Sequence, residues 1–166
     1  MPSFSPYPEV IPQIRLLVLD FDGVLTDNAV YVSQDGTEMV RCWRSDGLGL
    51  AQMPGIGIEV LVVSTEVNPV VSARCRKLKL TCVQGVEDKV AKLGQILIER
   101  GLEWRDVAYM GNDINDEGCL KRAALPIVPE DAHRAVIPLA LWRTEARGGY
   151  GAVREVCDEM IRVRKK

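Results

Sequence analysis

Five polar side chains suited to phosphate and metal chemistry each follow a short apolar run. Asp20 and Asp22 stand one residue apart in the stretch VLDFDGVLTD, Ser64 and Thr65 follow a second run, and Lys89 follows a third. Carboxylate oxygens hold Mg²⁺, whereas lysine and hydroxyl groups bind phosphate oxygens. These residue types therefore predict a site for a divalent cation and a phosphoryl group.

A later acidic cluster, GNDIND at residues 111–116, extends this set with Asn112, Asp113 and Asp116. With Mg²⁺ present, one aspartate can attack phosphorus and form an aspartyl phosphate, while a second acid one residue on protonates the leaving oxygen. Single Asp and Asn residues at strand ends are usually turn formers or helix caps, and Lys89 has the alternative of facing solvent from a first helical turn. The combination of D-x-D-G, a hydroxyl, a lysine and G-x-D-x-x-D favours the phosphoryl site.

The elements that would position these side chains are short strands alternating with amphipathic helices. The apolar runs predict buried parallel strands at Arg15–Leu19, Glu59–Val63, Thr81–Val83, Val107–Met110 and Leu125–Val128. Helices are predicted at Val70–Leu78 and Asp88–Glu99. This alternation indicates an α/β fold with a Rossmann-like doubly wound parallel sheet, in which polar residues at the carboxyl ends of the strands converge on one crevice.

One segment, residues 29–43, breaks the alternation and reads as a β-hairpin around Asp35 and Gly36. Its apolar residues are more numerous than a free two-stranded ribbon tolerates, and they are Val30, Val32, Met39, Val40 and Trp43. The hairpin therefore predicts a partner surface. Packing onto the core of the same subunit is the alternative.

Composition and charge limit the class of protein. The 166 residues are 47% hydrophobic and 27% charged, which fits one globular domain. A formal net charge of −2 gives no basic surface, so we expect no nucleic-acid partner. No apolar run reaches the roughly 18 residues that span a bilayer, so we expect no membrane contact. Residues 1–14 are interpreted as a linker or an artificial boundary, which hints at a longer parent chain.

The cysteines and the histidine form no metal motif. The five cysteines include no C-x-x-C pair, and His133 is the single histidine. We interpret the cysteines as reduced core thiols, which predicts an intracellular protein.

Together these motifs resemble a known superfamily. DFDGVLTD, VVST, Lys89 and GNDIND are similar to the four motifs of the haloacid dehalogenase superfamily of phosphatases. DGVLTD, the hairpin, SDGLGL and GGYGAVREVCDEM (148–160) resemble the capless, tetrameric subfamily of 3-deoxy-octulosonate 8-phosphate phosphatases. With STEVNPVVSARCRKLKL, the chain also resembles the C-terminal domain of animal cytidylyltransferases that activate sialic acid.

The resemblance implies a haloacid dehalogenase fold over residues 15–166, with the hairpin inserted after the first strand and no cap domain. It also implies a homotetramer assembled through the hairpin 29–43 and the C-terminal segment 148–160, which would reach a neighbour's site. The cofactor that it implies is Mg²⁺, and the small-molecule partner is a sugar-acid phosphate. A nuclear location follows from the likeness to the cytidylyltransferases, with the cytoplasm as the alternative.

The resemblance also assigns roles to individual residues. Asp20 would be the nucleophile and a Mg²⁺ ligand, and Asp22 the general acid that also ligates through its backbone carbonyl. Ser64, with Thr65 beside it, would bind the phosphate, and Lys89 would neutralise it.

Three positions depart from the family's pattern. The metal-binding acid of the fourth motif is replaced by Asn112, whose amide oxygen can ligate without charge, and Asp113 and Asp116 compensate only if the backbone aims them inward. Glu66 and Tyr150 stand where the phosphatases often carry arginine. Losing positive charge in this way weakens anion binding.

Two functions therefore remain open at this stage. One is an active Mg²⁺-dependent phosphatase acting on a nine-carbon, sialic-acid-type 9-phosphate. The other is a phosphatase-like domain that assembles and stabilises a cytidylyltransferase, with weak or lost chemistry of its own, and the three departures favour this second interpretation. The nucleotidyl-transfer site of such a parent enzyme would lie outside this chain, which has no G-x-x-x-x-G-K loop.

Overall fold

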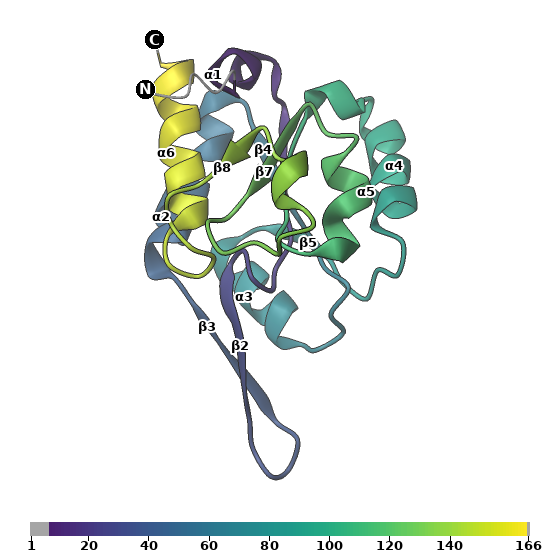
Figure 1. The fold of residues 1–166 in the computed structure, drawn as a ribbon, viewed down its shortest axis with the longest axis vertical. Coiled ribbons are helices and arrows are strands. Elements are labelled where there is room, and N and C mark those ends of the chain that lie inside the picture. Colours follow the sequence, from purple (N-terminus) through teal and green to yellow (C-terminus); the bar gives the residue numbers. More distant parts are fainter. Residues whose placement is uncertain (1–6, 166) are drawn as a thin grey trace.

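A six-stranded sheet between two layers of helices makes up the body of the protein (Figure 1). The computed structural model describes residues 7–165. The strand order is β5-β4-β1-β6-β7-β8, and every neighbouring pair is parallel. The strands of this sheet are β1 (Leu16–Leu19), β4 (Glu59–Val63), β5 (Thr81–Val83), β6 (Val107–Met110), β7 (Leu125–Val128) and β8 (Trp142–Arg143). The predicted doubly wound parallel sheet is confirmed.

Helices connect these strands. The α-helices are α1 (Tyr7–Val10), α2 (Arg44–Leu50), α3 (Val70–Leu78), α4 (Lys89–Arg100), α5 (Glu117–Leu120) and α6 (Ala152–Arg164). Short 3₁₀ segments are η1 (Ile11–Gln13), η2 (Met53–Ile56), η3 (Trp104–Asp106), η4 (Ile114–Asp116) and η5 (Ile137–Leu139). Helix α4 begins where Asp88 accepts a hydrogen bond from the Ala91 amide and ends at Gly101, whose φ is 63°. This start places Lys89 in the first turn, beside the carboxyl end of β1.

The central strand β1 is buried on both faces, which explains its unbroken apolar sequence. Leu17 and Leu19 belong to the core cluster shared with α2, α3 and α6, and Leu16 and Val18 belong to the cluster shared with α4 and α5. Since alternate side chains of a strand point to opposite faces, one strand anchors both layers. The chain then leaves the sheet at Asp20, at the edge of the site.

The hairpin is a separate two-stranded sheet, β2 (Thr26–Val32) paired with β3 (Glu38–Cys42), and it projects beyond the body of the molecule (Figure 1). Its turn lies at Asp35 and Gly36 as predicted, with Gly36 at a φ of 83°. The structure begins the hairpin at Thr26, a few residues before the predicted start. Val30, Val32 and Met39 are 49–63% exposed, whereas Val40, near the base of the hairpin, packs against the core and Trp43 is half-buried. Within this chain, therefore, only the base of the hairpin packs onto the core.

Part of the expected linker 1–14 packs against the domain, and its residues 1–6 lie outside the described residues. Tyr7 stacks on Trp142 with ring centroids 4.4 Å apart, and Ile11 and Ile14 are fully buried. The packed body of the protein therefore begins before residue 15. All five cysteines are free.

Candidate active site

The carboxyl ends of β1, β4 and β6 meet at a hollow of about 340 Å³. It is lined by Asp20, Asp22, Asn28, Thr65, Asn112, Asp113, Ile114 and Asn115. The structure thus brings predicted residues of the first, second and fourth motifs to one hollow, while Ser64 and Asp116 are buried and do not line it. The edge of the sheet is the one at which parallel α/β folds bind ligands.

Lys89 lies beneath this hollow and connects two aspartates. Its Nζ is 2.8 Å from Asp20 Oδ1 and 2.8 Å from Asp116 Oδ1, and the residue is only 3% exposed. The solvent-facing alternative for Lys89 is therefore excluded. Burial lowers the pKa of Lys89, but the carboxylates of Asp20 and Asp116 outweigh burial and hold it above its usual value. Lys89 is thus a permanent cation beside Asp20.

Asp116 is fully buried and both of its oxygens are engaged. Oδ1 accepts hydrogen bonds from Lys89 and from the Tyr109 hydroxyl at 2.6 Å, and Oδ2 accepts one from the Asn112 amide at 2.9 Å. Asp113 turns its Oδ1 to the Ile114 amide at 2.7 Å and caps η4. Asp116 therefore anchors Lys89 with oxygens that already have partners, whereas Asp113 caps η4 and also lines the hollow.

The Asn112 side-chain amide points at the Asp22 carbonyl oxygen and at Asp20 Oδ2, at 2.8 and 3.3 Å. With its nitrogen in that place the amide donates to both oxygens, and with its oxygen there it would complete a set of three oxygens. Ligand oxygens of an octahedral Mg²⁺ at about 2.0–2.1 Å from the ion are spaced at about 2.9 Å, so this donor set fits the cation. Within residues 7–165 no three His, Cys, Asp or Glu side chains gather as a metal cluster, because the set here uses a carbonyl and an amide.

The two aspartates of the first motif have raised pKa values. Burial and the nearby Asp116 raise the pKa of Asp20 to about 7, against the opposing effect of Lys89. Burial raises the pKa of Asp22, and Glu66 and Glu38 raise it further. A raised pKa keeps a larger fraction of Asp22 protonated, which is the state that a general acid needs.

The second motif places hydroxyl groups at the end of β4. Ser64 is 1% exposed and its Oγ accepts a hydrogen bond from the Glu66 amide at 3.1 Å, while Thr65 lines the hollow. Glu66 Oε1 accepts from the amides of Val67 and Asn68 at 2.8 and 2.9 Å. Glu66 therefore stabilises this loop in addition to its electrostatic effect on Asp22.

The C-terminal glycine segment packs beside the first motif of its own chain. The Gly149 amide donates to the Val24 carbonyl at 3.1 Å, and Arg41 Nη1 donates to the Gly149 carbonyl at 2.8 Å. The Arg41 guanidinium also lies 4.2 Å from the centre of the Tyr150 ring. A Cβ atom at Gly148 would collide with the Gly23 carbonyl, so the close approach requires a glycine there. Arg41 thus places a positive charge beside Tyr150, the position at which the sequence analysis expected an arginine.

Sequence reasoning missed Tyr109, Arg41 and Thr26. Tyr109 is part of a strand that reads as continuously apolar, and Arg41 lies in the hairpin, far from the motifs in sequence. Thr26 Oγ1 accepts hydrogen bonds from the amides of Gly23 and Asn28, each at 3.1 Å. The sequence offered one indication of the role of Thr26, namely a hydroxyl residue shortly after the D-x-D-G motif.

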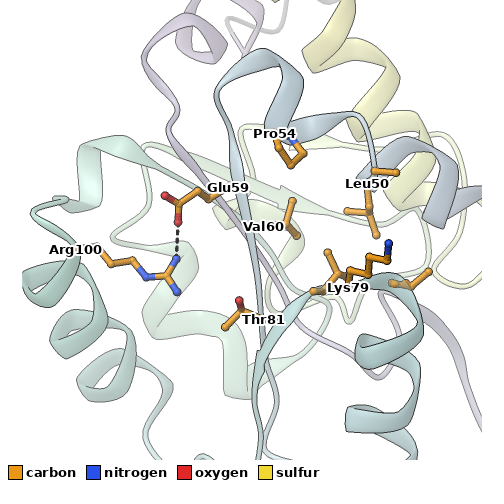
Figure 2. Close-up of a pocket in the computed structure, with 10 residues that line it drawn as sticks. Leu50, Pro54, Glu59, Val60, Lys79, Thr81 and Arg100 are labelled. Carbon is orange, nitrogen blue, oxygen red and sulfur yellow. Dashed lines mark hydrogen bonds and ion pairs between the residues drawn. The ribbon is translucent and has the colours of Figure 1, made fainter.

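A second hollow of about 530 Å³ lies at the opposite edge of the sheet, where β4 and β5 begin (Figure 2). Leu50 and Val60 contribute apolar surface, and Lys79 and the ion pair between Arg100 and Glu59, 2.7 Å apart, contribute charge. None of the motif residues lines it. Size alone therefore does not identify the reactive site.

Comparisons with known proteins agree with this geometry. The chain is 36% identical over 149 residues to the 3-deoxy-D-manno-octulosonate 8-phosphate phosphatase KdsC of Escherichia coli (strain K12), covering 89% of this chain and 79% of that protein. The fold matches the phosphatase of the same name from Moraxella catarrhalis, solved with magnesium ion, phosphate ion and KDO, with a TM-score of 0.93. That match has 27% identity and covers 98% of this chain and 94% of the other. No family model matches the chain.

The chain belongs to the haloacid dehalogenase superfamily, in the family of the 3-deoxy-D-manno-octulosonate 8-phosphate phosphatases. It is also 34% identical over 163 residues to N-acylneuraminate cytidylyltransferase A of Danio rerio, covering 96% of this chain but only 37% of that protein. Both predicted resemblances are confirmed. Within the described part of the chain, no helix is long and apolar enough to cross a membrane.

Proposed function

We propose that this protein is a Mg²⁺-dependent phosphatase that hydrolyses a sugar-acid phosphate through an aspartyl phosphate on Asp20. The observation that carries the proposal is the buried contact of 2.8 Å between Asp20 and Lys89 at the carboxyl end of β1. It places a carboxylate nucleophile beside a fixed cation that binds phosphate oxygens. The sequence alone favoured the assembly role, whereas the likeness to phosphatases over most of the chain supports catalysis.

The chain's own residues divide the work. Asp20 attacks phosphorus, and Asp22, one residue on, gives its proton to the leaving oxygen of the sugar and then takes a proton from the attacking water. Lys89 and the hydroxyls of Ser64 and Thr65 bind the phosphate oxygens. Asp116 and Tyr109 hold Lys89 in place.

The cation would be held by the Asp20 carboxylate, the Asp22 carbonyl and the Asn112 amide oxygen, supported by the Moraxella catarrhalis phosphatase that was solved with magnesium. When bound, Mg²⁺ neutralises charge between the nucleophile and the phosphoryl group. Because Asn112 is uncharged, this site would bind the cation more weakly than one with a second carboxylate at position 112.

For the substrate we propose a nine-carbon sugar acid phosphorylated at its far end. The match to a cytidylyltransferase named for N-acylneuraminate supports this class over the eight-carbon sugar. Glu66 replaces a cation beside Asp22 and favours hydroxyl or amide groups of the sugar, and Arg41 supplies positive charge at the other side of the first motif. Glu66 on one side of the first motif can accept hydrogen bonds from the sugar, and Arg41 on the other side can bind a carboxylate. This pair suits a sugar acid that carries hydroxyl or amide donors as well as a carboxylate.

Phosphate release tests the proposal. Purified protein with Mg²⁺ would be given N-acetylneuraminate 9-phosphate, KDO 8-phosphate and p-nitrophenyl phosphate. We expect turnover of the nine-carbon substrate with the highest kcat/KM, and none by Asp20→Asn, because an amide cannot form the phosphoaspartate. Background release by Asp20→Asn equal to that of the parent protein would refute Asp20 as nucleophile.

A second candidate is the role of a structural domain in a sialic-acid cytidylyltransferase, favoured by the 96% coverage of this chain in the Danio rerio match. Nucleotidyl transfer would then belong to another part of the parent protein. Absence of turnover on all three substrates, with Mg²⁺ binding and assembly intact, would favour this candidate.

We also propose a homotetramer in which the hairpin of one subunit covers the site of the next. Support comes from apolar side chains that stay exposed on the hairpin and beside the hollow. They are Val30, Tyr31, Val32, Met39, Val67 and Ile114, each between 49% and 75% exposed. Covering them would remove apolar surface from water and close the site.

A further inference from the structure

The Asn112 side-chain amide can present either its oxygen or its nitrogen to the Asp22 carbonyl oxygen and Asp20 Oδ2, and only the nitrogen makes hydrogen bonds there. With the oxygen inward, 2.8 Å from the Asp22 carbonyl oxygen and 3.3 Å from Asp20 Oδ2, three oxygens face one another and repel unless a cation lies between them. Turned by half a revolution, the amide nitrogen occupies the same position and donates hydrogen bonds to both oxygens. The residue is 7% exposed, so water contributes little to either arrangement.

Each orientation suits a different state of the site. Three converging oxygens suit a cation, whose charge offsets their mutual repulsion. Without a cation, the same repulsion favours the turned amide, because an NH₂ group then satisfies both acceptors. An ionised aspartate at this position has acceptors only and cannot make this exchange.

Of the two Asp20 carboxylate oxygens, only one is left for the turned amide of Asn112. Asp20 Oδ1 is already held by Lys89 at 2.8 Å and by the Phe21 amide at 2.8 Å. Only Oδ2 remains for a further donor, and Asn112 is positioned to supply it. A Cβ atom at Gly23 would collide with the Asn112 amide, so the glycine provides the space in which the group turns.

We propose that Asn112 is a metal-responsive latch: in the cation-free protein its amide nitrogen ties Asp20 Oδ2 to the Asp22 carbonyl, and loading of the cation turns the oxygen inward and frees Asp20. This inference rests on the proposed function and adds regulation to the same site. The latch explains why an amide stands at position 112 in place of an acid. The amide stabilises the cation-free state, and it lowers the affinity for the cation. The nucleophile is then released only after the cation binds.

The test compares the parent protein with Asn112→Asp in EDTA and across a Mg²⁺ titration, following the melting temperature. In EDTA we expect Asn112→Asp to melt at least about 4 °C below the parent, because two hydrogen bonds become facing oxygens. Its Mg²⁺-induced rise should be larger, with a half-saturating Mg²⁺ concentration at least about tenfold lower. The matched control is Asn115→Asp, which adds the same charge at the exposed rim of the hollow and should melt like the parent in EDTA.

A second measurement uses the parent protein alone, with ¹⁵N-labelled asparagine. The Asn112 NH₂ protons should exchange slowly with solvent in EDTA and at least about tenfold faster with saturating Mg²⁺, as the two hydrogen bonds are given up. Equal exchange in both conditions, or an Asn112→Asp protein as stable as the parent in EDTA, overturns the latch. These results are independent of phosphate release: a protein that shows them yet hydrolyses no sugar-acid phosphate keeps the latch and loses the proposed function.

Discussion

Lys89 sets the charge balance of the site at the scale of single residues. Two carboxylates, Asp20 and Asp116, lie within 2.8 Å of its ammonium group, all nearly excluded from water. Such a cluster is tolerated only because further donors satisfy the remaining oxygens, as Tyr109 does for Asp116. Asp116, which the sequence analysis offered as a possible metal ligand, thus helps to hold Lys89 in position.

Removal of one hydroxyl tests this arrangement. Tyr109→Phe leaves Asp116 Oδ1 with Lys89 as its remaining side-chain donor, so we expect the free energy of unfolding in urea to fall by about 1–3 kcal/mol. We also expect kcat to fall more than KM changes, because Lys89 loses part of its support. Tyr7→Phe is the control, since that ring stacks on Trp142 away from the candidate site and the loss of its hydroxyl should change neither quantity. An unfolding free energy for Tyr109→Phe within error of the parent would contradict the role assigned to the hydroxyl.

At the scale of elements, a buried acid joins α2 to α6. Asp46 is fully buried, its Oδ1 accepts the Arg154 amide at 3.0 Å, and its Oδ2 has no hydrogen-bond partner. Burial raises the pKa of Asp46 to about 7, although the Arg154 amide and the charges of Arg74 and Arg154 pull it down. Burial raises the pKa values of the Cys42 and Cys157 thiols, and the nearby Asp46 charge raises them further.

This pKa predicts how stability depends on pH. Since an unfolded aspartate has a pKa of about 3.9, folded Asp46 holds its proton more tightly, and the contribution of Asp46 to stability falls as pH rises from about 4 to about 7 and then levels off. Asp46→Asn keeps an oxygen for the Arg154 amide and removes the charge. We expect the variant to match the parent near pH 4 and to be more stable at pH 8 by about 1–3 kcal/mol.

Urea unfolding at both pH values provides the measurement. Asp158→Asn, on the exposed face of α6, serves as the control and should show no such pH-dependent gain. If the difference between Asp46→Asn and the parent is the same at pH 4 and pH 8, the buried carboxyl does not titrate in this window.

The elements that could be predicted are those whose pattern is local. Five strands of the parallel sheet, and helices α3 and α4, lie within a residue or two of their predicted bounds. Strand β8 has only two residues, which is too short to leave a pattern. Helix α2 contains Gly47 and Gly49, which weaken helix propensity, and it forms because a glycine at 49 lets it approach Cys157 of α6 closely. Such long-range packing leaves no local signal.

The candidate site divides in the same way. Asp20, Thr65 and Asn112 were predicted to lie together because each follows a strand of a parallel sheet, and the structure places all three at one hollow. The direction in which Asp116 points, and the contact of Arg41 with Gly149, depend on side-chain packing across the fold. Sequence reasoning therefore located the site but did not distinguish the residues that face the hollow from those that support it.

At the scale of the whole molecule, the hairpin dominates the shape (Figure 1). It projects from the edge of the sheet that holds the candidate site, while α1 and the end of α6 lie at the opposite end. Tyr31 and Met39 are paired across the two strands and share one face, and Val30 and Val32 share the other. With apolar residues exposed on both faces, a hairpin in this position can bury them only against other copies or other chains.

Charge placed on one face of the hairpin tests the proposed tetramer. Tyr31→Asp with Met39→Asp puts two like charges directly opposite each other on a surface that assembly would bury, so we expect dissociation to monomers of 18.4 kDa in sedimentation velocity. Gln34→Asp, a single charge at the polar turn, is the control and should remain assembled. Because the hairpin of one subunit is proposed to cover the site of the next, kcat/KM on the sugar-acid phosphate should fall together with assembly in the double variant. A double variant that stays tetrameric would place the interface elsewhere, and one that dissociates with full activity would show that each subunit completes its own site.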